Sequence, residues 1–275
     1  MILNDVDAIK ILKRAYFIES FERNILSLEE KELLEIPVYL GLGQEYIAAS
    51  LATYYENNPV AIFAQHRAHS YYLAFGGNAG ALKAEILGDV QAGCARGYGG
   101  SVGIYSKEIN MFGHSGLMGE QIYLGVGWSF ASKSRSLVIL GDATIEEDYA
   151  LPSIGFAAKH NLPVTFICED NGFAVMTPTS KRRSWSASEV VSAYGVKSID
   201  LEDDPSHIFE ALNSIDNVGP LFLNIRTQRK NRHVGAYLEG VVKWDRKKLF
   251  EEFISNIMSS ADFKALKLEG ESHEW

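Results

Sequence analysis

The chain has 275 residues, of which 47% are hydrophobic and 22% charged, as is usual for a globular protein with a sizeable core. Its formal net charge of −9 argues against a nucleic-acid-binding surface, which normally carries a basic patch. Residues 1–14 lack the apolar stretch of a signal peptide, and no run reaches the roughly 18 apolar residues of a membrane span. We therefore expect a cytoplasmic protein that acts on a small molecule, with no nucleic-acid or membrane partner.

Helical periodicity dominates the N-terminal part of the chain. Residues 5–35 place apolar side chains at helical spacing, and a second helix is expected after Gly43. Eight glycines then crowd residues 93–119, which predicts an irregular loop whose backbone approaches another group closely. Helical spacing resumes over residues 121–132.

The centre of the chain alternates between short apolar runs and helical patterns. Continuous apolar runs of this length are typical of strands buried on both faces of a parallel sheet. The expected strands are 137–140, 163–168, 196–199 and 221–225, and the expected helices are 149–159, 208–212 and one near 249–257. The alternation implies an α/β fold with an open, mostly parallel sheet and helices on both faces. We expect one α/β domain with an N-terminal helical arm over residues 1–236, and a helical extension over 237–275.

Polar side chains follow two of the predicted strands. Gly141-Asp142 and Asp170-Asn171 lie at strand ends joined by one crossover helix, where ligands of such sheets bind. A carboxylate and an amide oxygen suit Mg²⁺, and a helix after Asp142 would offer its N-terminus to an anion. A metal-bridged diphosphate is the ligand that this pattern favours. The alternative is structural: Asp142 caps a helix and Asn171-Gly172 forms a turn.

Several segments resemble one family. Gly141 to Ala143, with Asn171 following Asp142 by 29 positions, resembles the thiamine diphosphate motif that begins Gly-Asp-Gly and ends Asn-Asn. The chain, from about residue 10 to 235, resembles the α subunit of the decarboxylating component of 2-oxoacid dehydrogenases of the pyruvate, branched-chain and acetoin types. The other matching segments are 66–69 (Tyr-Arg-Ala-His in the family), 97–101, 116–121, 161–163 and 169–172. The resemblance implies the diphosphate-binding domain of a thiamine diphosphate-binding fold.

The resemblance implies a metal site at the strand ends. Asp142 and Asn171 would bind Mg²⁺ through their side chains, and Phe173 would bind it through its backbone carbonyl. Two residues depart from the family pattern. Ala143 replaces a glycine, and Asp170 replaces the first asparagine of the closing pair and adds a negative charge.

The resemblance also implies contacts with the rest of the cofactor. Arg67 would pair with the diphosphate, for which its planar guanidinium is suited. His66 replaces the family's tyrosine and would donate one hydrogen bond to phosphate. Gly116 and Met118 would face the aminopyrimidine. The backbone that would approach the diphosphate belongs to Gly141, Asp142, Ala143 and Thr144.

Other polar residues leave more than one interpretation open. His233 matches a family histidine near the diphosphate and the substrate entrance, which makes it the one catalytic candidate. It lies in the stretch 229–235, where the decarboxylases have a His-Gly-His-Ser loop of which only His233 remains. His69 is as consistent with a structural role as with a catalytic one, and we interpret His114 as structural or solvated. For residues 181–183 (Lys-Arg-Arg), a solvated loop is favoured over attraction of an anionic substrate.

The resemblance implies a two-subunit enzyme. A separate β subunit would carry the pyrimidine-binding domain, in an assembly of two α and two β chains. A split transketolase-like or carboligating enzyme is slightly favoured, because the His233 loop is altered. The alternatives are a 2-oxoacid dehydrogenase subunit that transfers an acyl group to lipoyl, and a non-catalytic binding subunit. A Rossmann dehydrogenase is disfavoured because no GxGxxG lies between a strand and a helix.

Overall fold

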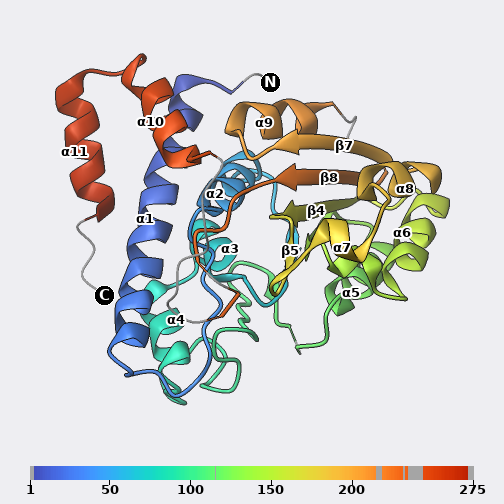
Figure 1. Ribbon diagram of the computed structural model, residues 1–275, viewed down its shortest axis with the longest axis horizontal. Helices are drawn as coiled ribbons and strands as arrows, with labels where there is room; N and C mark the ends of the chain where they lie inside the picture. The colour runs from blue at the N-terminus through green and yellow to red at the C-terminus, as the bar shows by residue number, and fades with distance from the viewer. Residues whose placement is uncertain (1–2, 115, 215–218, 232, 235–243, 272–275) are drawn as a thin grey trace.

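A six-stranded parallel sheet forms the centre of the molecule (Figure 1). The computed structural model describes residues 3–114, 116–214, 219–231, 233–234 and 244–271. The strand order is β2-β1-β3-β4-β8-β7, and β5 and β6 form a separate antiparallel hairpin. The strands are β1 (Ala61–Phe63), β2 (Met111–Phe112), β3 (Ser136–Gly141), β4 (Val164–Asp170), β5 (Phe173–Ala174), β6 (Thr177–Pro178), β7 (Lys197–Glu202) and β8 (Leu221–Arg226).

Helices cover both faces of the sheet, as the sequence predicts. They are α1 (Asp5–Glu30), α2 (Glu45–Tyr54), α3 (His69–Ala74), α4 (Ala79–Ile86), α5 (Glu120–Ser132), the 3₁₀ turn η1 (Thr144–Glu146), α6 (Ala150–Lys159), α7 (Thr179–Arg182), α8 (Ala187–Ala193), α9 (Pro205–Asn213), α10 (Arg246–Ser255) and α11 (Ser260–Glu271). Pro152 lies in the first turn of α6, where proline costs no hydrogen bond.

Alternate residues of the central strands enter two separate cores. Leu137 and Ile139 of β3 pack toward α2, α3 and α9. Val138 and Leu140 of the same strand pack toward α5, α6 and α8. Because both faces are buried, residues 137–140 of β3 are all apolar, and residues 164–168 of β4 are apolar except for Thr165, so both strands are recognisable in the sequence.

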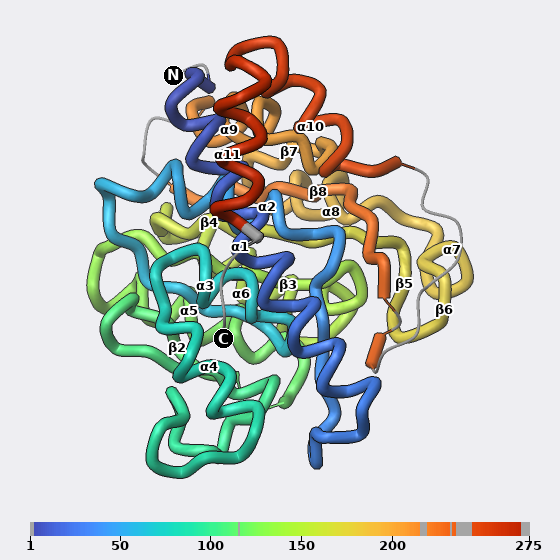
Figure 2. The backbone as a smooth tube through the Cα atoms, turned by 90° about the vertical axis from the view of Figure 1, so that its left-hand side faces the viewer, coloured from blue at the N-terminus to red at the C-terminus, as the bar shows by residue number. Residues whose placement is uncertain are grey.

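A further layer of helices covers the side of the molecule that carries α2 and α9. Helices α1, α10 and α11 pack there through a third core that includes Leu12, Phe250 and Leu266. Figure 2 shows α11 lying along α1. Of these, α10 corresponds to the helix expected near residues 249–257, and the predicted boundary at 236/237 lies outside the described residues. None of the helices in the described ranges combines the length and apolarity that a membrane crossing needs.

Two sequence-based predictions need correction. The first helix was expected to run to residue 35 but ends at Glu30. Glu32 adopts a left-handed φ of +56°, and the N–H of Leu33 donates to the carbonyl of Leu28, which closes the helix. The short strands β1 and β2 were not predicted because runs of three and two residues give no periodicity.

The glycine-rich segment 93–119 is largely irregular, as predicted, and the group that its backbone approaches is the carboxylate of Glu85. This side chain on α4 is fully buried. Its oxygens accept hydrogen bonds from the backbone N–H groups of Ala95 (2.6 Å), Gly97 (2.9 Å), Gly99 (2.7 Å) and Gly100 (3.1 Å). The loop is therefore folded around a buried anion supplied by the chain itself.

Candidate functional site

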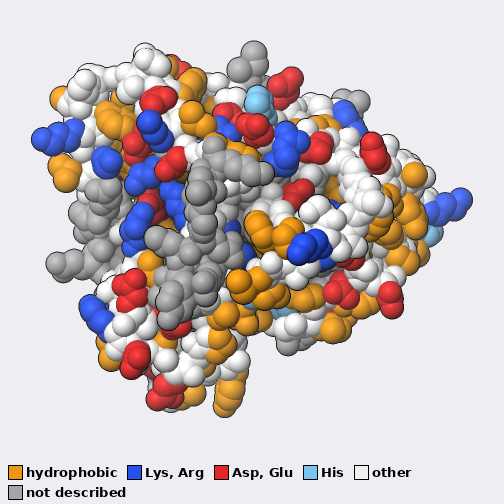
Figure 3. Space-filling model, viewed as in Figure 1, with side chains coloured by type: hydrophobic (Ala, Val, Ile, Leu, Met, Phe, Trp, Pro, Cys, Tyr) orange, Lys and Arg blue, Asp and Glu red, His pale blue; other side chains and the backbone are white. Residues whose placement is uncertain are grey.

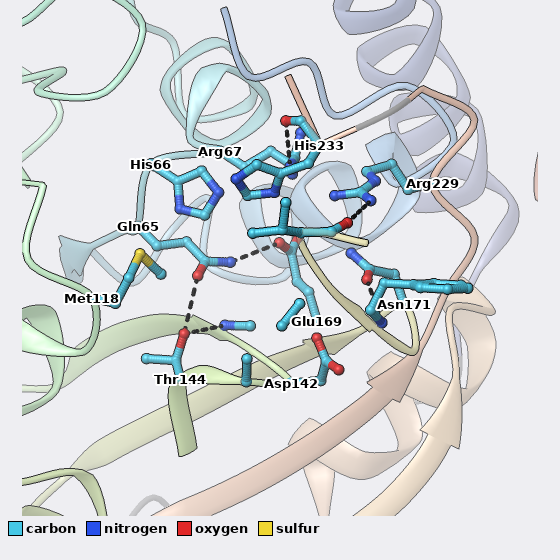
Figure 4. Close-up of a pocket in the computed structure, with 15 residues that line it drawn as sticks. Gln65, His66, Arg67, Met118, Asp142, Thr144, Glu169, Asn171, Arg229 and His233 are labelled. Carbon is cyan, nitrogen blue, oxygen red and sulfur yellow. Dashed lines mark hydrogen bonds between the residues drawn. The ribbon is translucent and has the colours of Figure 1, made fainter. Parts of the chain in front are cut away.

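A pocket lies where four neighbouring strands end (Figure 4). Residues 65–67 follow β1, 142–144 follow β3, Asn171 follows β4, and Arg229 and His233 follow β8. Its lining comprises Gln65, His66, Arg67, Met118, Gly141, Asp142, Ala143, Thr144, Glu169, Asn171, Phe173, Ala174, Val175, Arg229 and His233. The site residues predicted from the sequence therefore converge here, with one exception. Gly116 does not line the pocket, and its N–H donates to Nδ1 of His114 at 2.9 Å.

Asp142 is buried and held by the segment that follows β6. Its Oδ2 accepts hydrogen bonds from Thr179 Oγ1 (2.6 Å) and from Arg182 (2.5 Å). Arg183 donates to the backbone carbonyl of Asp142. Burial raises the pKa of the Asp142 carboxyl, and the bond from Thr179 opposes this shift. The side chain does not cap the following turn, so the capping alternative does not hold.

The prediction of a solvated loop at residues 181–183 is wrong for two of its three side chains. The Arg182 and Arg183 side chains are only 12% and 4% exposed, and both pair with Glu146 as well as with Asp142. Lys181 alone is exposed, as expected. The charge pattern of the sequence does not reveal this because both acidic partners lie about 40 residues earlier in the chain.

Asn171 forms the turn that was its structural alternative in the sequence analysis. Its Oδ1 accepts from the N–H of Phe173 at 3.2 Å, its Nδ2 donates to Gln44 at 3.3 Å, and Gly172 adopts a φ of +79°. The neighbouring Asp170 does not line the pocket. Its carboxylate accepts from the N–H of Gly172 (3.1 Å) and from Asn224 (3.2 Å), so the extra charge is used in fixing the turn.

The backbone after Asp142 differs from the expected helix start. A single 3₁₀ turn, η1, follows, and α6 begins only at Ala150. Within the part of the chain that the structure describes, the N–H groups of Ala143 and Thr144 have no hydrogen-bond acceptor. Two backbone donors at the edge of the pocket suit an anionic ligand.

His66 lies in the pocket wall, and both of its ring nitrogens are buried without a hydrogen-bond partner among the described residues. Its ring packs against Tyr39 and His233, with centroids 5.0 and 5.3 Å away. Burial, followed by the charge of Arg67, lowers the pKa of His66 to about 2, and burial lowers the pKa of His233 to about 4. Both imidazoles are therefore neutral near pH 7. Buried polar atoms are normally satisfied, so the unpaired nitrogens of His66 indicate a ligand.

Arg67 is 5% exposed and thus is not a surface ion pair. It donates to the backbone carbonyls of Leu40 and His233, the second at 3.2 Å. The guanidinium therefore ties the segment after β8 to the wall of the pocket.

The sequence analysis missed several lining residues, chiefly Gln65, Glu169 and Arg229. Gln65 lies 3.5 Å from both Thr144 Oγ1 and Glu169 Oε2, and Tyr71 donates to Glu169 Oε1 at 2.6 Å. Burial raises the pKa of Glu169 to about 7. Position in the chain could have identified two of them, because Glu169 lies near the carboxyl end of β4 and Arg229 lies just after β8.

His69 has the structural role that was one of its two interpretations. Its Nδ1 lies 2.8 Å from Glu22 and its Nε2 lies 2.9 Å from Ser101 Oγ. The ring is buried and does not line the pocket. His114 is also buried, which agrees with a structural interpretation.

Comparison with known families matches residues 15–233 to the family Dehydrogenase E1 component. The chain belongs to this family. Among similar proteins, the pyruvate dehydrogenase E1 component subunit alpha of Zymomonas mobilis is 28% identical over 241 residues, covering 82% of this chain and 67% of that protein. The corresponding subunit of Rhizobium meliloti is 28% identical over 239 residues, with coverages of 82% and 68%. A mitochondrial alpha-1 subunit of rice is 31% identical over 173 residues, with coverages of 61% and 43%.

The similarity to E1 alpha subunits confirms the family resemblance predicted from the sequence. This E1-family chain spans about two thirds of the length of the bacterial relatives and less than half of the plant one. Among solved structures, a transketolase of Campylobacter jejuni matches with a TM-score of 0.58 and 14% identity, covering 97% of this chain and 49% of that chain. At this identity the match concerns the fold alone, and it agrees with the predicted thiamine diphosphate-binding fold.

Proposed function

We propose that the pocket binds the diphosphate end of thiamine diphosphate together with Mg²⁺, in the α subunit of a 2-oxoacid dehydrogenase. The observation that carries this proposal is the convergence of Asp142, Asn171 and Arg67 from three strand ends on one pocket. Family membership favours the same cofactor.

The donor set suits both parts of the ligand. Asp142, Asn171 and the carbonyl of Phe173 offer hard oxygen atoms and one protein charge, which fits a magnesium ion shared with phosphate oxygens. Arg67 and the N–H groups of Ala143 and Thr144 would hold the diphosphate. The unpaired His66 nitrogens supply a further hydrogen bond. The methyl group of Ala143 lies at the pocket wall without closing it.

When bound, the cofactor would supply a nucleophilic carbon and an electron sink for chemistry at a carbonyl group. The chain itself would orient the diphosphate and exclude water from it. Neutral His233, beside Arg67 at the pocket wall, would accept or donate a hydrogen bond to the substrate. Its depressed pKa keeps the ring uncharged at neutral pH, so it adds no fixed charge to the site.

A β subunit would complete the site with the pyrimidine-binding half, in an assembly of two α and two β chains. Hydrophobic residues of the pocket rim support this partner, because Phe173, Val175 and Met176 are 41%, 55% and 64% exposed. Figure 3 shows hydrophobic side chains at the surface in the region of β5 and α7. If the isolated chain forms complete, active sites, the two-subunit proposal is wrong.

The sequence-similar relatives support the decarboxylating alternative better than the transketolase-like reading that the sequence analysis slightly favoured. The altered loop at 229–235 still distinguishes this chain from the decarboxylases, and Arg232 and Gly235 of that loop lie outside the described residues.

The deciding experiment measures CO₂ release by the chain reconstituted with its β subunit, thiamine diphosphate and Mg²⁺, across a panel of 2-oxoacids. Release from one or more of them is expected. A complex that holds cofactor, releases no CO₂ and transfers a two-carbon unit from a ketose to an aldehyde would instead establish the transketolase-like function.

A further inference from the structure

Thr179 joins the two loops that converge on the proposed metal site. Its backbone N–H donates to the carbonyl of Gly172 at 2.9 Å, within the turn between Asn171 and Phe173. Its hydroxyl donates to Oδ2 of Asp142 at 2.6 Å. A single residue outside the pocket lining thus contacts both the loop after β3 and the turn after β4.

Two arginines reinforce this connection. Arg182 donates to the same Oδ2 atom of Asp142, to Thr179 Oγ1 (2.9 Å) and to Glu146. Arg183 holds the backbone carbonyl of Asp142 and the Glu146 carboxylate, and its guanidinium lies over the ring of Trp185 at 4.7 Å. Exposed ion pairs contribute little, but these two side chains are largely buried and share several partners.

The connection fixes Asp142 in one orientation. Oδ2 is engaged by Thr179 and Arg182, while Oδ1 makes no hydrogen bond to any residue in the described ranges. A carboxylate held in this way presents one oxygen to the pocket. Partners behind a metal ligand set its direction, and Mg²⁺ tolerates little departure from octahedral geometry.

We propose that Thr179, supported by Arg182, is a positioning residue that holds Asp142 and the 171–173 turn at the separation that Mg²⁺ requires. This inference rests on the proposed function, because it concerns the same metal. Neither side chain needs to touch the ion or the cofactor: both act through Asp142, and Thr179 acts also through Gly172.

The test compares three threonine variants of the full chain. Thr179→Val keeps the branched shape but loses the hydroxyl donor, and Thr179→Ser restores the donor. Thr177→Val changes an exposed threonine of the adjacent strand β6. The affinity for Mn²⁺ is measured by electron paramagnetic resonance in the presence of thiamine diphosphate, and thermal unfolding checks the fold. We expect Thr179→Val to bind Mn²⁺ about 10- to 100-fold more weakly, in line with other losses behind a metal ligand. Thr179→Ser and Thr177→Val should bind as the unaltered chain does.

Unchanged affinity in folded Thr179→Val overturns the proposal, as does equal weakening in Thr177→Val. If Thr179→Val does not fold, Arg182→Lys replaces it, because lysine keeps the charge but cannot reach Asp142 and Glu146 with one planar fork. Weaker Mn²⁺ binding by this variant supports the proposal, and unchanged binding overturns it. An Asp142→Asn variant separates the two hypotheses. If Asp142→Asn binds Mn²⁺ normally, the proposed metal site is wrong. If Asp142→Asn loses Mn²⁺ binding but Thr179→Val binds Mn²⁺ normally, only the positioning role is refuted.

Discussion

The hydroxyl of Tyr71 donates to the buried carboxyl of Glu169 at 2.6 Å, linking α3 to the end of β4 beneath the pocket. Gln65 extends this link to Thr144, so three of the strand ends are joined by side-chain hydrogen bonds. The position of the proposed diphosphate site therefore depends on hydrogen bonds among residues of its own lining and on Tyr71 behind them.

Replacing Tyr71 by Phe is expected to lower the free energy of unfolding by about 1–3 kcal/mol, because an oxygen of a fully buried carboxyl group loses its donor. Urea denaturation measures the change. Tyr98→Phe, at a position 87% exposed, is the control and should have little effect. Equal stability of the two variants would show that Tyr71 contributes only its ring.

Replacing Glu85 by Gln should destabilise the chain by at least about 2 kcal/mol, since an amide NH₂ group would face backbone N–H donors that now share a carboxylate. Urea denaturation again provides the measurement, with the exposed Glu210→Gln as the control. Hydrogen exchange at residues 95–100 should rise in the Glu85 variant. Unaltered exchange there would contradict the role assigned to this carboxylate.

Glu45 gives stability a dependence on pH. Its side chain is buried and accepts from the N–H of Gly43 at 2.8 Å; burial, and then the charge of Glu19, raise its pKa to about 8. The folded state thus holds a proton that the unfolded chain releases near pH 4.5. Stability from this group is complete below about pH 4.5 and falls as the pH rises to about 8.

Glu45→Gln should therefore flatten the decline in unfolding free energy between pH 5 and pH 8, measured by urea titrations at intervals across that range. Glu169, with its pKa raised to about 7, will retain part of the slope. The same slope in the variant and the unaltered chain would exclude Glu45 as its source.

Asp142→Ala is expected to abolish Mg²⁺-dependent binding of thiamine diphosphate, because the carboxylate proposed to bind the metal is removed. Isothermal titration with and without Mg²⁺ measures this. Asp148→Ala, at an exposed position of the same loop, should bind normally. Retention of Mg²⁺-dependent binding by the Asp142 variant would remove the metal assignment.

His66→Phe should have opposite effects on stability and on binding. The free chain should be as stable or more stable, because two buried nitrogens without partners are replaced by carbon. Thiamine diphosphate should bind about tenfold more weakly, since one hydrogen bond to phosphate is lost. Thermal unfolding and isothermal titration test the two effects, and the exposed His160→Phe is the control. A variant that binds normally would show that His66 serves packing alone.

The central sheet and most of the pocket were predictable because they follow from local patterns. Strands β3 and β4 carry the largely apolar runs 137–140 and 164–168, and Asp142 and Asn171 come directly after these strands. Parallel strands bring their carboxyl ends to one edge, so sequence order alone places these side chains together. The family resemblance added Arg67 and His66, which no periodicity singles out.

The remaining features depend on tertiary contacts that leave no local pattern. Arg182 and Arg183 belong to a polar stretch that is typical of a solvated loop, yet their partners lie on the loop after β3. The hydrogen bond from Asn224 to Asp170 could not be predicted, because Asn224 lies on β8, more than 50 residues later in the chain. Strands β1 and β2 are recognisable only from their pairing with β3 and with each other.

The shape of the glycine-rich loop depends on a residue outside the loop, the buried Glu85 of α4. The curvature of residues 95–100 is specified by a side chain on the preceding helix, and the loop residues contribute only N–H groups and conformational freedom. A transplant of residues 93–119 into another protein would thus lose its shape unless α4 accompanied it. Conversely, substitutions within 95–100 that preserve the backbone path leave the anchor intact, so this loop can change its surface chemistry while its framework persists.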